Sequence, residues 1–213
     1  MPVNPEIEKY VTAGILPRYR DFDAAHNTGH VTRVIEDSLR LAPHFSVSLD
    51  MVYIVAAYHD LGLAGGRENH HKVSAEMLRA DVELQRWFTA ADIDMMAEAI
   101  EDHRASSSGE PRSIYGKIVA EADRDIEPIT VLRRAVQYGL NKFPGFTKEE
   151  QYARFCSHMD EKYAEGGYMK LWIPFSRNAK GLAALRVILK DDRELQSVFD
   201  TIYNEESHKI GRI

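Results

Sequence analysis

The chain has a single cysteine, Cys156, among its 213 residues. One cysteine excludes an intrachain disulfide and is typical of a protein from a reducing compartment. An excess of basic residues is also missing, because 27 lysines and arginines stand against 33 aspartates and glutamates, a net charge of −6. This balance argues against stable binding to nucleic acid or to an anionic membrane. A phosphate-bearing substrate is not excluded, because a bound metal ion can dominate the local electric field.

Long hydrophobic runs are absent as well. The longest, Met51–Tyr58, is far shorter than the roughly 20 residues that span a bilayer. The first residues, MPVNPEIEKY, lack the basic start and the apolar stretch of a signal peptide. We therefore expect a cytoplasmic protein with no membrane partner.

Strand-like alternation is not found, whereas nearly every long segment has helical periodicity. Thr28–Ala42 has apolar residues at helical spacing, with Thr28 as its predicted N-cap and Pro43 just after its end. Leu49–Leu61 is apolar almost all round, which predicts a buried central helix that Gly62 ends in a left-handed conformation. Further helices are expected over residues 6–19, 70–81, 92–103, 114–126, 129–140, 148–165, 178–190 and 193–204.

The domain organisation is simple at this level. The chain has no internal repeat, low-complexity tract or clear linker, and its length suits one domain with an elaborated end. We predict one all-α domain over residues 1–213, with a C-terminal helical extension over about 141–213.

Six residues of metal-ligand type lie on or beside these predicted helices. They are His30, His59, Asp60, His70, His103 and Asp123. Four imidazoles and two carboxylates are more than one tetrahedral site needs, which indicates two metal ions. The donor types suit divalent ions of Fe, Mn, Mg, Zn, Co or Ni rather than a metal that prefers thiolates.

A purely structural interpretation exists for each of these residues. His59 alone could be a hydrogen-bonded core histidine, although Asp60, within the apolar run VYIVAAYHDL, would be costly to bury without a partner or a metal. A lone inward histidine is usually a hydrogen-bonded core residue. The combination favours a site, because several separate helices each present a donor to the interior. Periodicity does not separate His70 from its neighbour His71.

The order of the six residues, His … His-Asp … His … His … Asp, resembles a known signature. It is similar to that of the HD superfamily of metal-dependent phosphohydrolases, in the variant with six ligands and two metals. The stretches GHVTRV, AAYHDLG and EADRDIE resemble the three core segments of the superfamily, over residues of about 27–127. The resemblance implies an all-α HD helical bundle with a binuclear site.

A second resemblance concerns the stretch HHKVSAEML, which is similar to a ligand-bearing helix of HD-GYP phosphodiesterases. There the ligand histidine lies four residues before a small residue that is followed by alanine. That alignment favours His70 as the ligand, with Ser74 and Ala75 as the small pair. The Gly-Tyr-Pro motif of the HD-GYP family is missing, so cleavage of cyclic dinucleotides is not expected.

The resemblance to the superfamily implies a phosphomonoesterase or phosphodiesterase that acts on a nucleotide or another small phosphorylated metabolite. Asp60 is the expected bridge between two metals and the expected catalytic residue. The other ligands are expected to divide into His30, His59 and Asp123 for one ion and His70 and His103 for the other.

His26, near the pocket mouth, and Arg104, beside the ASSSGEP loop, are the predicted substrate-binding residues. Arginine can bind a phosphate in bidentate geometry, although many surface arginines are only solvated. Two alternatives stay open: an HD-type mixed-valent di-iron oxygenase, and a non-catalytic metal-containing protein that binds or regulates. The C-terminal helices are expected either to cover the pocket or to form the face of a homodimer.

Overall fold

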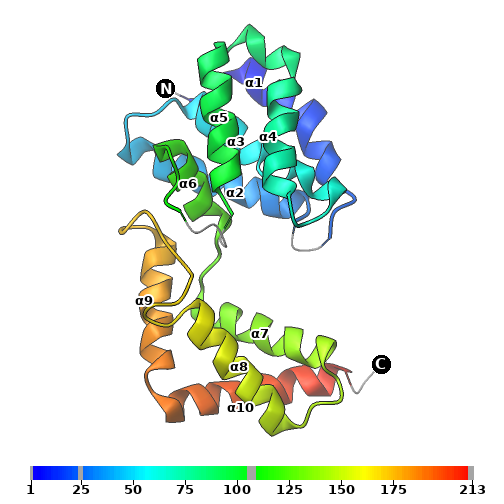
Figure 1. Cartoon of the computed structure of the whole chain (residues 1–213), viewed down its shortest axis with the longest axis vertical. Helices are drawn as coiled ribbons and strands as arrows, with labels where there is room; N and C mark the ends of the chain where they lie inside the picture. The colour runs from blue at the N-terminus through cyan, green and yellow to red at the C-terminus, as the bar shows by residue number, and fades with distance from the viewer. Residues whose placement is uncertain (1, 24–25, 105–108, 211–213) are drawn as a thin grey trace. The chain divides into compact units, whose positions relative to one another are not determined.

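The computed structural model describes residues 2–23, 26–104 and 109–210, and these residues form helices and loops without any strand. The all-α prediction is therefore confirmed. The chain folds into two compact units, one made of residues 1–124 and 171–173, the other of residues 125–170 and 174–213 (Figure 1). The first four residues of the ASSSGEP loop, 105–108, lie outside the described residues.

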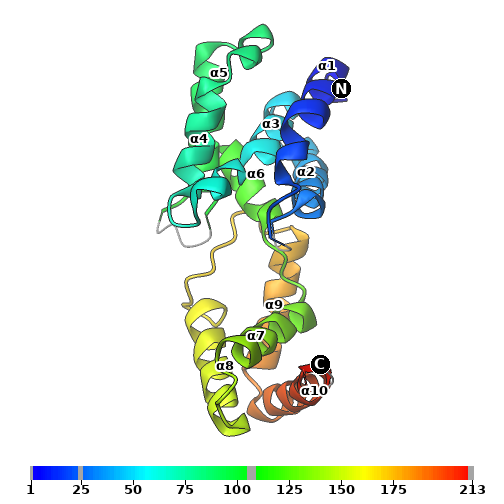
Figure 2. The same ribbon diagram turned by 90° about the vertical axis from the view of Figure 1, so that its right-hand side faces the viewer.

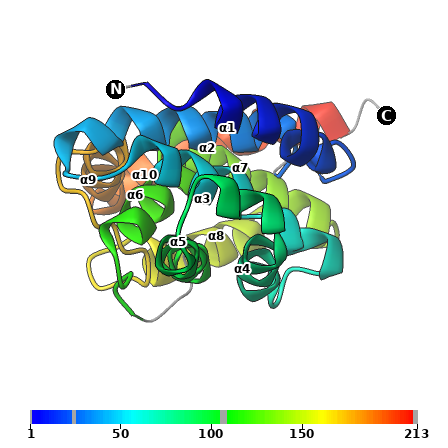
Figure 3. The same ribbon diagram turned by 90° about the horizontal axis from the view of Figure 1, so that it is seen from above.

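The first unit contains the helices of the N-terminal part of the chain. Its α-helices are α1 (Pro5–Tyr10), α2 (Thr28–Leu41), α3 (Leu49–Tyr58), α4 (His70–Ala80), α5 (Ala90–Asp102) and α6 (Ile114–Asp123). A π-helical turn covers Val11–Ile15, and 3-10 turns cover Leu16–Tyr19, Ala42–His44, Leu61–Gly65 and Val82–Arg86. Figure 2 shows α4 and α5 on one side of α3 and α6, with α1 and α2 on the other. The pairing of α4 with α5 is also visible in Figure 3.

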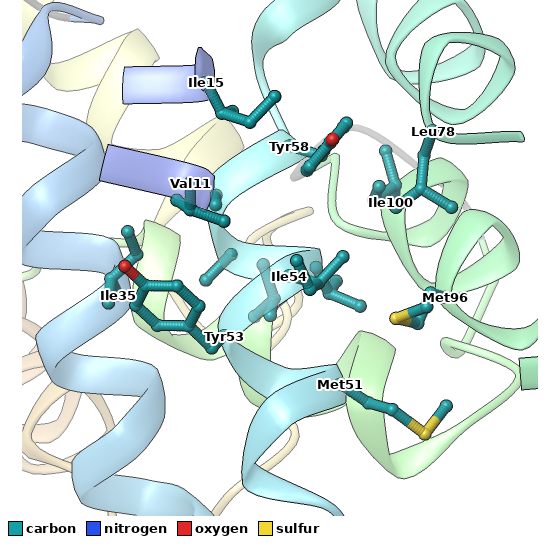
Figure 4. Packing of buried hydrophobic residues seen from close by; sticks show 14 of the residues in the cluster. Val11, Ile15, Ile35, Met51, Tyr53, Ile54, Tyr58, Leu78, Met96 and Ile100 are labelled. Carbon is teal, nitrogen blue, oxygen red and sulfur yellow. The ribbon is translucent and has the colours of Figure 1, made fainter. Parts of the chain in front are cut away.

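Helix α3 is buried all round, as its sequence predicts. Every residue from Met51 to Tyr58 is buried. In Figure 4, Ile54 lies between Val11 of the N-terminal segment and Ile100 of α5. Since apolar groups on all sides hold α3, the residues that follow its end are placed firmly in the interior.

Helix α3 ends at Tyr58, three residues before its predicted end. Gly62 is not the left-handed residue that we predicted, since the positive-φ residues of the described part are Gly66 and Gly166. It lies in a 3-10 turn that α4 approaches closely. A Cβ atom on Gly62 would lie 2.2 Å from the carbonyl oxygen of His70, so glycine is required here by contact rather than by conformation.

The N-cap of α2 is Asn27, and the prediction of Thr28 was wrong by one residue. The side-chain oxygen of Asn27 accepts hydrogen bonds from the amides of Gly29, at 2.9 Å, and His30, at 3.2 Å. Asparagine is at least as good a cap as threonine, so the earlier residue starts the helix. His30 consequently lies in the first turn of α2.

The second unit contains α7 (Pro128–Lys142), α8 (Lys148–Lys162), α9 (Arg177–Leu189) and α10 (Asp192–Ile210). Thr147 and Glu150 form a capping box that starts α8. The buried rings of Phe155 on α8 and Phe199 on α10 pack with their centroids 5.1 Å apart. The last helix continues beyond its predicted end at residue 204. No helix in the described part of the chain combines the length and the apolar character needed to cross a bilayer.

Candidate metal centre

The structure brings all six predicted ligand side chains together in the first unit. They come from the first turn of α2 (His30), the residues after α3 (His59 and Asp60), the start of α4 (His70), the C-cap of α5 (His103) and the last residue of α6 (Asp123). They form two groups that share Asp60, with the same membership that the sequence predicted. Their role as metal ligands stays a prediction.

The first group joins α2, the end of α3 and the end of α6. His30 Nε2 lies 3.4 Å from Asp60 Oδ2, 3.2 Å from Asp123 Oδ1 and 3.2 Å from His59 Nε2. His59 Nε2 lies 3.2 Å from Asp60 Oδ2. Two ligand atoms that are each about 2.1 Å from a tetrahedral metal lie about 3.4 Å apart, so these spacings fit one bound ion.

The second group joins Asp60 to α4 and α5. The Nε2 atoms of His70 and His103 lie 3.4 Å and 3.5 Å from Asp60 Oδ1, and 3.3 Å from each other. Asp60 therefore presents Oδ2 to the first group and Oδ1 to the second. This division is the geometry expected of a carboxylate that bridges two ions.

Main-chain carbonyl groups fix the orientation of three of the imidazoles. The Nδ1 atoms of His59, His70 and His103 lie 2.8, 2.8 and 2.6 Å from the carbonyl oxygen three residues earlier in the chain. Each Nδ1–H donates to that oxygen, so in the neutral ring the lone pair is on Nε2. In the second group, two such lone pairs and a carboxylate oxygen face one another. A cation placed among them removes this repulsion.

His30 is oriented differently, by an arginine that sequence analysis missed. The Arg33 guanidinium lies 3.3 Å from His30 Nδ1 and donates to the carbonyl oxygens of Ala122, Asp123 and Arg124, at 3.2, 3.3 and 3.4 Å. It therefore ties α2 to the end of α6 and holds the main chain of Asp123 in place. The only sequence signal for this role is its position one helical turn after His30.

The buried charges of the site favour a positive occupant. Burial by itself raises the pKa of Asp60, but the charge of His59 and a hydrogen bond from His103 outweigh it and hold that pKa well below its usual range. Burial lowers the pKa of His30, whereas hydrogen bonds to Asp123 and Asp60 raise it to about 9. The lowered pKa keeps Asp60 ionised. The raised pKa of His30 means that, without a metal ion, a proton on this ring supplies the positive charge beside the two carboxylates, and a bound metal ion would take its place.

The close approach at Gly62 explains why His70, rather than His71, joins the second group. The Gly62 amide donates to Ser74 Oγ at 2.8 Å, and both Ser74 and Ala75 are buried. These small residues let α4 pack directly against the turn after Asp60 and so fix the rotation of the helix about its axis. His71 belongs to neither group of donors.

The two predicted substrate-binding residues lie near the six donors. The His26 ring lies 5.8 Å from the His30 ring, and its Nε2 lies 3.0 Å from Arg67 Nη2. Arg104 Nη1 donates to the carbonyl oxygen of Glu68, at 2.8 Å, in the loop before α4. Each is thus beside one group of donors, and a role in binding substrate stays a prediction.

Comparison with known proteins finds a family model and a solved structure that are similar to this chain. The model of the HD domain family matches residues 28–126, which is close to the predicted core of about 27–127. A crystal structure of a predicted HD superfamily hydrolase from an uncultured Thermotogales bacterium is similar, with 24% sequence identity and a TM-score of 0.48. That similarity covers 70% of this chain and 81% of the other. Among curated proteins no match is found.

Proposed function

We propose that this chain, whose residues 28–126 match the HD domain family model, is a metal-dependent hydrolase that cleaves phosphoric esters. The expected substrate is a nucleotide or another small phosphorylated metabolite. One observation carries the proposal: the two oxygens of the buried Asp60 face two separate groups of imidazole donors. Two divalent ions held side by side are a common means of hydrolysing phosphate esters in proteins, and these residues would hold such a pair.

The chain's own residues would hold the ions and prepare the site. His30, His59, Asp60 and Asp123 would hold one ion, and Asp60, His70 and His103 the other. When bound, such ions supply Lewis acidity and neutralise the charge of a phosphoryl group. The carbonyl partners of His59, His70 and His103 would keep the Nε2 atoms of these three rings aimed at the ions. Arg104 and His26, which are partly buried, would offer a positive charge and an imidazole ring to the rest of the substrate.

A second function is compatible with the same donors. Four imidazoles and two carboxylates suit iron as well as manganese or magnesium, so the main alternative function is that of a di-iron oxygenase. A non-catalytic protein that keeps the metal for stability is the other. The hydrolase releases phosphate without O₂. The oxygenase requires O₂, and the non-catalytic protein forms no product.

The decisive assay measures phosphate release and oxygen consumption on one panel of phosphorylated metabolites. The chain is loaded in turn with Mn, Fe, Mg, Co and Ni, and each preparation is assayed with and without air. We expect phosphate release that needs a metal but no O₂. Asp60→Asn should lower it by about 100-fold or more, because a neutral amide cannot bridge two cations.

The matched control is Asp94→Asn, which removes an exposed carboxylate of α5 that pairs with Arg79. Its activity should equal that of the unaltered chain. Product formation that depends on O₂ would favour the oxygenase, and full activity of Asp60→Asn would refute the proposal.

A further inference from the structure

The second unit contains a cavity of about 390 Å³ between α7 and α8. This volume is within the range of about 300–1,000 Å³ that is typical of pockets for small molecules. The polar and aromatic residues that line it are Arg134, Tyr138, Arg154, His158, Lys162 and Tyr163. The helices that form it are labelled in the view of Figure 1. All of these residues belong to the second unit, so the cavity shares no residue with the six donors of the first unit.

The cavity is lined by cations without any acidic residue, although the chain as a whole carries a charge of −6. Arg134 is partly compensated by Asp125, at 3.0 Å, but that carboxylate also faces Arg177, at 3.6 Å. Among the described residues, no carboxylate lies within 4.0 Å of the Arg154 guanidinium. A site that gathers positive charge in a net-negative protein is suited to an anion.

Arg154 is held in place by the main chain of α7. Its Nη2 donates to the carbonyl oxygen of Ala135, at 2.6 Å, and its guanidinium lies 5.8 Å from the centre of the Tyr138 ring. A Cβ atom on Gly139 would lie 2.6 Å from Nη2 and 2.8 Å from Nε, so the guanidinium packs where only glycine leaves room. An arginine that is ordered before binding loses little freedom when it receives a ligand.

The other residues of the cavity complete the features of an anion site. Lys162 Nζ lies 5.1 Å from the centre of the Tyr163 ring, at the end of α8. Burial lowers the pKa of the half-buried His158, and the charges of Lys162 and Arg154 lower it further. This second effect indicates a positive local potential. The exposed ring of Tyr138 provides a face on which a planar group can stack.

We propose that this cavity between α7 and α8 binds a small phosphate-bearing molecule, with Arg154 as its anchor and Lys162 as a second cation. Arginine binds phosphate oxygens in bidentate geometry, and lysine adds a point charge. The source of the phosphate is either an inorganic anion or a nucleotide whose base stacks on Tyr138. The proposal does not depend on the metal centre, because it requires no residue of the first unit.

Isothermal titration calorimetry on the full chain tests this site. The protein is kept free of metal with a chelator, and it is titrated with inorganic phosphate, pyrophosphate and adenosine monophosphate. We expect saturable binding of at least one of them, and a higher affinity for the nucleotide identifies that source. Arg154→Gln should weaken the binding about tenfold or more, and Lys162→Gln several-fold.

The matched control is Lys190→Gln, which removes an exposed lysine of the same unit that pairs with Glu165. Its affinity should equal that of the unaltered chain. Lys162 lies at the end of its helix, so Lys162→Gln tests the site even if Arg154→Gln disturbs the packing on Gly139. The proposal is overturned if none of the three anions binds saturably, or if Lys162→Gln binds as tightly as the control. Because no metal is present, neither result depends on hydrolysis.

Discussion

Asp60 is the side chain on which both groups of donors depend. It is 4% exposed, and its two oxygens are 3.2–3.5 Å from four imidazole nitrogens. A carboxylate in such a position is stable only with compensating positive charge. The cost of burying this charge was visible in the sequence, because the aspartate follows an apolar run, and it predicted that Asp60 has a partner or a metal. The role of Asp60 as a bridge stays a prediction.

Other features of the site could not be predicted from residue types. The carbonyl oxygens that orient His59, His70 and His103 belong to the main chain, and any residue could supply them. The contacts of Arg33 are of the same kind, because they join it to carbonyl groups about 90 positions further along the chain. A sequence pattern shows which donors exist but not which backbone groups turn them toward each other.

Gly62 provides a prediction about a single residue. In Gly62→Ala, the added Cβ would lie 2.2 Å from the His70 carbonyl oxygen and 2.7 Å from the Ser74 amide nitrogen, so α4 must move. We expect a loss of about 1–3 kcal/mol in the free energy of unfolding, measured in urea. Because His70 would move with the helix, the affinity for the ion of the second group should also fall.

Gly65→Ala is the matched control in the same 3-10 turn. A Cβ atom on Gly65 would meet no atom within 4 Å, and this glycine has no positive φ. Its stability and metal affinity should therefore stay unchanged or rise slightly. If the two variants were equally stable, the close approach of α4 would not be what positions His70.

At the scale of the elements, apolar patterns and caps predicted most helices of the first unit. The all-round apolar character of α3 and the turn-rich residues after it predicted its burial and its approximate end. The pattern did not show that Gly62 is needed for the close approach of α4 and not for the end of α3. That contact lies between two segments, whereas periodicity describes one segment at a time.

In the second unit, too, contacts between helices could not be predicted from the pattern of each helix. Its helices were predicted approximately, but its cavity needs Arg134 on α7 to face Arg154 on α8, and no motif indicates that pairing. The carboxylate of Glu206, on α10, is another example. It accepts hydrogen bonds from Arg133 and Gln137 on α7, at 2.6 and 3.0 Å, and from Lys209 at 2.7 Å.

The contacts of Glu206 predict how acid affects the second unit. The hydrogen bonds from Lys209 and Gln137 lower its pKa to about 2, from an ordinary value of 4.5. A lowered pKa stabilises the fold above pH 4.5, and this stabilisation disappears as the pH falls toward 2. Glu206→Gln should therefore be less stable by about 2 kcal/mol at pH 7. The difference should shrink as the pH is lowered below 4.5.

Urea unfolding followed by circular dichroism at several pH values measures this difference. Glu205→Gln is the control, because Glu205 is 49% exposed and pairs with Arg133 at 2.7 Å. An exposed pair contributes little, so this variant should lose at most about 1 kcal/mol. An equal loss in both variants, or a loss for Glu206→Gln that does not vary with pH, would contradict the assignment.

At the scale of the whole molecule, the two compact units have different chemistry. The first carries all six donors and most of the residues that match the HD domain model, whereas the second carries the cavity lined by Arg134, Arg154 and Lys162. The chain divides after residue 124, immediately beyond Asp123. The prediction of one domain with an extension from about residue 141 stays a prediction, and the division into compact units falls earlier in the chain.

The convergence of donors from residues 30 to 123 is also a property of the whole first unit. Each donor lies near the end of a helix or just after it, so the site exists only when all these helices are packed. Ions that bind the folded chain but not the unfolded chain therefore stabilise the fold by mass action.

The most direct test of this account counts the metal ions bound by each folded chain. The unaltered chain, His103→Gln and the control His208→Gln, from the exposed end of α10, are loaded with manganese and analysed by inductively coupled plasma mass spectrometry. Two ions in the unaltered chain and in the control, with one in His103→Gln, is the predicted result. No tightly bound ion in the unaltered chain, or an equal count in all three proteins, would contradict the binuclear centre.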